Sequence, residues 1–175
     1  QAGFDLMWVL KQIFFTEEQL GREKRRLPGS PSFVTIDQRG QIYTATISTS
    51  HAQVKRFNLG GINTLPERDY GAPYFRTGVS MFNAVAVDPK GIITAVDANT
   101  GQIFQYTPNG DKLFVFGGRS IAAIEKMGLI NQAAGLAIRS DGLIIVSDSR
   151  SNTLHVFKPT EFAQLVHEAV YLFED

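Results

Sequence analysis

The sequence predicts an all-β fold, a β-propeller segment of about three four-stranded blades, with a helix at each end. A motif of alternating apolar residues around a glycine occurs three times, and its glycines Gly40, Gly91 and Gly142 are spaced 51 residues apart. A fixed period of this size indicates a propeller or another repeat architecture. Turn residues recur every ~8–12 residues between short runs rich in Val, Ile, Tyr and Thr, which is typical of many short strands.

Each unit begins with two predicted strands around a tight turn. In the second unit Val85 and Val87 point to one face, residues 88–91 form the turn, and Ile93 resumes the alternation. A period of two residues is typical of strands, and glycine supplies the positive φ that such a turn requires. The shared alternation predicts core positions at Val34, Ile36, Val85, Val87, Ile93, Leu136, Ile138 and Ile144.

A second turn follows at a constant offset. Asp97 and Asp148 each lie six residues after the glycine of their unit, and Thr46 takes this place in the first unit, where the loop is longer. An aspartate that opens a turn accepts hydrogen bonds from nearby backbone N–H groups, so we interpret both as structural rather than catalytic. A fourth strand is evident only in the middle unit, at residues 112–116, and four antiparallel strands are typical of a propeller blade.

Residues 85–110 and 136–157 resemble NHL repeats, in which V-x-V-D-x-x-G-x-I-x-V-x-D is followed by N-x-x-I-x-x-F. The resemblance extends from Pro31 to about Pro159. The chain is similar in particular to bacterial NHL proteins whose propeller leads into a helix beginning F-x-P-T-E-F, here residues 157–162. The resemblance implies a ring of about six blades, of which this chain supplies half, followed by a helical, TPR-like region.

The chain divides into three segments. Residues 1–30 form an N-terminal helical segment with a capping pattern at Thr16, residues 31–159 form the blades, and residues 160–175 form an amphipathic helix capped by Thr160. Its apolar stripe consists of Phe162, Leu165, Val166, Ala169, Val170 and Phe173. The stripe continues to the end without a stop signal, so we expect a fragment of a longer protein.

Composition limits the function classes. The formal net charge is zero, which argues against nucleic-acid binding driven by bulk charge. The chain has no cysteine, which excludes disulfides and thiolate metal sites, and no apolar run reaches the ~20 residues of a membrane span. The three histidines, His51, His155 and His167, occupy different places in the repeat. We therefore expect no metal and no cofactor.

Residues found in one unit only are the better candidates for binding. The candidates are Tyr70, Tyr74, Phe75, Arg76, Arg119 and Arg139, four of them in an insert at residues 66–78. Loops often carry function, and Tyr and Arg are enriched at binding hot spots. We expect a non-enzymatic scaffold for protein or peptide partners. The alternative is a propeller hydrolase or lyase, lactonase-like, whose active site is completed by missing blades.

Three blades do not close a ring. Half a ring leaves the outer faces of the first and third blades uncovered and apolar, which soluble monomers avoid. We expect either further blades in the longer protein or a homodimer of this chain that completes the ring with twofold symmetry.

Overall fold

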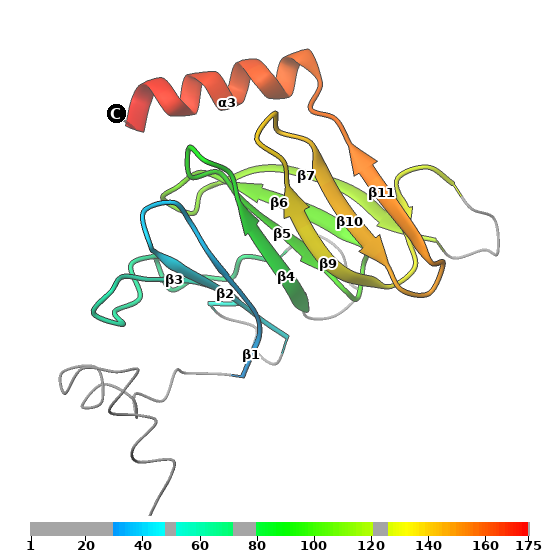
Figure 1. Ribbon diagram of the computed structural model, residues 1–175, viewed down its shortest axis with the longest axis horizontal. Helices are drawn as coiled ribbons and strands as arrows, with labels where there is room; N and C mark the ends of the chain where they lie inside the picture. The colour runs from blue at the N-terminus through cyan, green and yellow to red at the C-terminus, as the bar shows by residue number, and fades with distance from the viewer. Residues whose placement is uncertain (1–29, 48–51, 72–79, 121–125, 175) are drawn as a thin grey trace, which may run out of the picture.

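The computed structural model describes residues 30–47, 52–71, 80–120 and 126–174, which form three β-sheets and one helix (Figure 1). The first sheet contains β1 (Pro31–Ile36), β2 (Ile42–Thr46) and β3 (Val54–Phe57). The middle sheet contains β4 (Phe82–Val87), β5 (Ile93–Asp97), β6 (Gln102–Tyr106), β7 (Lys112–Arg119) and β8 (Leu129–Ile130). The third sheet contains β9 (Ala133–Ile138), β10 (Ile144–Asp148) and β11 (Thr153–Phe157), and the helix is α3 (Glu161–Glu174).

The number of strands differs between the sheets. The strand order follows the chain in each sheet, and neighbours are antiparallel except for the parallel pair of β7 and β8. β7 confirms the predicted fourth strand of the middle unit and extends it to Arg119. Among the described residues the first and third sheets have three strands each, and a fourth strand is not described for these units. The physical reason in the third sheet is that Pro159 leads the chain into α3 instead of into another strand.

The three sheets pack side by side as consecutive blades of a partial propeller (Figure 1). β4 contacts both β1 and β9, so the first strand of each sheet forms the inner end of its blade. One apolar cluster, including Tyr43, Val85 and Phe104, lies between the first and middle sheets. A second, including Ile103 and Ile144, lies between the middle and third sheets. The middle sheet is therefore covered on both faces.

The predicted core is correct for the middle and third units and wrong at two positions of the first. Val85, Ile93, Leu136 and Ile144 are buried, and Val87 and Ile138 are half-buried. Val34 and Ile36 are instead 61% and 65% exposed, because they lie on the face of β1 that points away from the middle sheet. The outer face of the third sheet is uncovered too, with Leu154 and Val156 exposed. The expectation of bare apolar faces on the end blades is confirmed for these residues.

The first turn of each unit has the predicted geometry. Gly40, Gly91 and Gly142 have φ values of 77°, 99° and 83°, in the left-handed region that favours glycine. In each unit the N–H of this glycine donates to the carbonyl three residues earlier, at 2.9–3.1 Å. The 51-residue spacing of the glycines therefore corresponds to one repeated backbone conformation.

The repeated aspartates hold the second turn, as the sequence predicts. The Asp97 carboxylate accepts hydrogen bonds from the N–H groups of Met81 (3.1 Å) and Asn99 (2.8 Å). The buried Asp148 carboxylate accepts from the N–H groups of Asn131, Gln132, Arg150 and Ser151. Burial alone would raise the pKa of Asp148, but these hydrogen bonds outweigh it and hold the pKa at about 2.

α3 begins where the sequence predicts, because Thr160 Oγ1 accepts a hydrogen bond from the Ala163 N–H at 3.2 Å. The predicted apolar stripe is only partly correct. Val166 and Val170 are half-buried, whereas Phe162, Leu165, Ala169 and Phe173 are exposed. The reason is that His167 and Tyr171 contact the sheets and turn their face of the helix inward.

The N-terminal helix is predicted within residues 1–29, which lie outside the described residues. Among the residues that the structure describes, α3 is the one helix. No helix in these ranges is long and apolar enough to cross a membrane.

Candidate functional site

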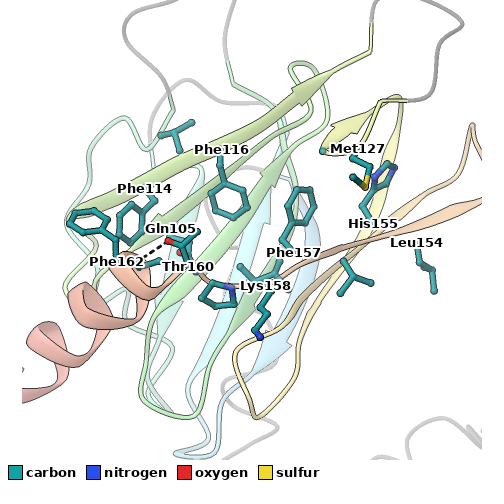
Figure 2. A pocket seen from close by; sticks show the side chains of 16 residues that line it. Gln105, Phe114, Phe116, Met127, Leu154, His155, Phe157, Lys158, Thr160 and Phe162 are labelled. Carbon is teal, nitrogen blue, oxygen red and sulfur yellow. Dashed lines mark hydrogen bonds between the residues drawn. The ribbon is translucent and has the colours of Figure 1, made fainter.

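A groove of about 700 Å³ lies between the outer strand of the middle sheet, β7, and the last strand of the third sheet, β11 (Figure 2). β7 contributes Phe114 and Phe116, and β11 contributes all its residues from Leu154 to Phe157. The start of α3 closes one end with Phe162, and Met127 lies at the other end. Most of these side chains are apolar, so the groove offers a hydrophobic surface for a ligand.

Aromatic side chains form the floor of the groove. Phe116 and Phe157 join the two sheets, with ring centroids 5.4 Å apart. Phe114 lies 6.2 Å from Phe162 and 5.8 Å from His167, again between ring centroids, so it fixes the start of α3. Edge-to-face rings at these distances add to the stability that burial provides. The floor is therefore preformed by contacts within the chain.

The polar side chains that line the groove among the described residues are Gln105, His155, Lys158 and Thr160, and the first two contact neighbouring side chains. Gln105 Oε1 lies 3.2 Å from His167 Nε2 of α3. Burial lowers the pKa of His167 against the opposing effect of the Asp88 charge, which favours a neutral ring. His155 Nε2 lies 3.3 Å from Thr153 Oγ1 and 3.6 Å from Asp148 Oδ2. Both groups are thus occupied by neighbours within the chain.

β11 is the edge of its sheet. It pairs with β10 over five residues, from Thr153 to Phe157, and β10 lies between it and β9. An edge strand presents unpaired N–H and C=O groups along its free side. On this strand Leu154 is 68% exposed and Val156 is 59% exposed. The groove therefore combines an apolar floor with a free strand edge.

A second, more polar cavity of about 380 Å³ lies under α3, against the turns at residues 88–90 and 138–142. The Tyr171 hydroxyl donates to Asp88 Oδ2 at 2.5 Å, and Lys90 Nζ lies 4.1 Å from the centre of the Tyr171 ring. Burial and the interaction with Asp88 raise the pKa of this hydroxyl. These contacts hold α3 against the turns, so we interpret the second cavity as part of the helix attachment.

The predicted binding residues that the structure describes, Tyr70, Arg119 and Arg139, do not lie together. Tyr70 is buried, its hydroxyl donates to the Pro66 carbonyl at 2.8 Å, and its ring packs on Tyr106, so its side chain belongs to the core. Tyr74, Phe75 and Arg76 lie outside the described residues.

The two remaining candidates lie at opposite ends of the strands. Arg119 is exposed and donates to the Asn99 carbonyl at 3.3 Å, beside the second turn of its unit. Arg139 is exposed at the first turn of the third unit, where it forms an ion pair with Asp141. They are separate surface residues. Within the described ranges no three His, Asp or Glu side chains are grouped to hold a metal ion.

The groove is not among the features predicted above, although one signal in the sequence points to it. In the middle unit Pro108 is followed by an Asn-Gly turn and β7, whereas in the third unit Pro159 is followed by the helix cap Thr160. A unit that exchanges its last strand for a helix leaves a strand position empty. The neighbouring blade then forms one wall of the space.

Comparison with known proteins supports the fold. No family model and no curated protein matches the chain. A structure of a catalytically inactive variant of virginiamycin B lyase from Staphylococcus aureus, with quinupristin, matches with a TM-score of 0.51 and 17% identity, over 79% of this chain and 45% of the lyase. The selenomethionine-substituted lyase from the same organism matches with a TM-score of 0.49 and 11% identity, over 76% and 42%.

The match to the inactive variant concerns architecture. Virginiamycin B lyase is a six-bladed β-propeller, and the similarity identifies the three sheets as propeller-like. The chain spans less than half of the length of the lyase. At 17% identity the likeness shows the fold alone.

Proposed function

We propose that this chain is an NHL-type propeller segment that acts as a non-enzymatic scaffold and binds a protein or peptide partner in the groove between β7 and β11. The observation that carries the proposal is the apolar groove itself, preformed beside a free strand edge. A preformed site loses little free energy to ordering when a ligand binds.

The surface chemistry of the groove suits a polypeptide. Leu154, Val156 and Met127 are exposed and line the groove. Figure 2 shows Phe116 and Phe157 in the space between the two sheets. Contiguous exposed apolar surface marks interaction sites in soluble proteins, and Met and Phe are enriched at interfaces. The groove offers few charged groups that would select a small ionic substrate, since Lys158 is the one charged residue that lines it among those described.

The same proposal accounts for the bare faces of the end blades. Val34 and Ile36 on the first sheet, and Leu154 and Val156 on the third, are apolar and exposed. We propose that they pack against further blades of a six-bladed ring, supplied by a longer protein or by a second copy of this chain. β11 would then border both the groove and the next blade.

The test uses one groove variant and one matched control. Leu154→Lys places a charge at the rim, and Leu59→Lys changes a leucine of the first sheet's loop that is 80% exposed. Peptides are selected from a random displayed library against the 175-residue chain, and their affinities are measured by calorimetry. We expect binding to weaken at least ~10-fold in Leu154→Lys and to stay unchanged in Leu59→Lys.

Two results would contradict the proposal. One is a library that yields no peptide above background. The other is a set of binders whose affinities are indifferent to Leu154→Lys. The likeness in fold to a lyase is no evidence of lyase activity in this chain.

A further inference from the structure

We infer that the partner binds by strand addition: an extended segment of about five residues pairs antiparallel with the free edge of β11 and becomes the fourth strand of the third sheet. The inference rests on the proposed function, because it specifies the partner of the same groove. The ligand is an extended apolar polypeptide, and β11 recognises it through main-chain hydrogen bonds.

The chain itself fills the equivalent position in the middle sheet. β6 and β11 are the third strands of their units, and their residues correspond at the 51-residue offset of the repeat. β7 pairs with β6 from the pair of Gln102 and Gly117 to the pair of Tyr106 and Lys112. No described strand occupies this place beside β11. The middle blade is thus an internal template for the missing strand.

Burial measures the difference between the two positions. Ile103 and Phe104 of β6 are fully buried, with 0% exposure. On β11, Leu154 at the place of Ile103 is 68% exposed, and no residue of the strand is buried. The two strands have the same length and the same place in the repeat. The vacant fourth-strand position contributes to this exposure, together with the missing next blade.

The described chain does not fill the vacancy beside β11. In the middle unit the segment after Pro108 turns back, with the Gly110 N–H donating to the Thr107 carbonyl at 2.9 Å, and β7 follows. In the third unit Thr160 caps α3, which runs across the ends of the strands (Figure 1). α3 touches the groove only with its first residues, Phe162 and Ala163. No other described residue of the chain pairs with the free edge.

The template defines the side chains of the occupant. In the middle blade Val115 pairs with Phe104, which corresponds to His155. A residue opposite His155 shares its face and points toward the aromatic floor, so an aliphatic side chain fits there. Its neighbours stand beside Leu154 and Val156 on the outer face, where the template has Phe116 and Phe114. Proline is excluded at pairing positions because it lacks the N–H donor.

The experiment uses a synthetic peptide that copies residues 111–119, DKLFVFGGR, and the strongest binder from the library. Each is made in three forms: unmodified, and N-methylated on one or the other alternating set of residues. N-methylation removes N–H donors and leaves the side chains intact. In an added strand only one set points its N–H groups to β11. We therefore expect one methylated form to lose at least ~10-fold in affinity and the other to bind as the unmodified peptide does.

Hydrogen exchange of the 175-residue chain provides the second readout. We expect the bound peptide to slow exchange of amides in residues 153–157 and to leave β3, the last strand of the first sheet, unaffected. Binders that depend on Leu154 but have equal affinities in both methylated forms would overturn strand addition and leave the proposed function standing. Concentration-dependent dimerisation that protects β11 without any peptide would assign the edge to a second copy and would also overturn the inference. A library without binders would defeat the proposed function itself.

Discussion

Truncation of Ile93 tests the stacking of the blades. Ile93 is fully buried in β5, opposite Val87 and Tyr106, in the cluster between the first and middle sheets. Ile93→Ala removes three carbons, which costs roughly 2 kcal/mol of transfer free energy. A cavity cost adds to this, because two hydrogen-bonded sheets flank the site and limit its collapse. We expect a total loss of about 3–4 kcal/mol, a large share of the ~5–15 kcal/mol typical of a domain.

Ile36→Ala is the matched control, since Ile36 is 65% exposed on the outer face of β1. We expect it to cost less than about 1 kcal/mol. Urea unfolding followed by far-ultraviolet circular dichroism measures both variants against the unmodified chain. Equal losses in the two variants, or an unchanged midpoint in Ile93→Ala, would refute the assignment of Ile93 to an interface between stacked sheets.

The remaining predictions concern the second turn of the units. Gly101 has a φ of 65°, and an added Cβ would lie 2.6 Å from the Gly118 carbonyl oxygen, so Gly101→Ala should cost more than about 2 kcal/mol in thermal unfolding. The equivalent Asn152, with a φ of 52°, already carries a Cβ in this conformation, so Asn152→Ala should cost only about 1 kcal/mol. The opposite order of the two losses would contradict this account. Asp148 titrates at a pKa of about 2 in the folded chain, below its ordinary 3.8, so its carboxylate stabilises the fold above pH 3.8 and this contribution is lost as the pH falls toward 2. In Asp148→Asn the free energy of unfolding should fall by about 2 kcal/mol less than in the unmodified chain as the pH is lowered through this range. An equal fall in both chains would count against the hydrogen-bond network.

The sequence predicted what local chemistry determines. Gly91 and its equivalents require one backbone conformation, and Asp148 accepts hydrogen bonds from the N–H groups of Arg150 and Ser151, two and three residues later. Thr160 caps a helix through the residue three positions later. These features depend on neighbours along the chain, so they are readable from residue types and spacing.

The sequence could not predict what depends on the next blade. Alternation places Val34 and Val85 at the same position of the repeat, yet one is exposed and the other buried, because only the middle sheet is covered on both faces. Tyr70 looked like a loop residue available for binding, but tertiary packing on Tyr106 makes it part of the core. The groove lies where no described strand follows β11 in the third sheet. An absent strand has no residues that could form a sequence pattern.

The central place of β4 has a consequence for how the molecule comes apart. At the backbone level, the first and third sheets both contact the middle sheet mainly through this one strand. In an array where units contact only their neighbours, stability is set by the links between adjacent units, and opening starts at the ends. Either outer blade can then fray while the other remains docked, but the loss of β4 uncouples both at once. Cooperativity across the segment therefore depends strongly on one strand of six residues.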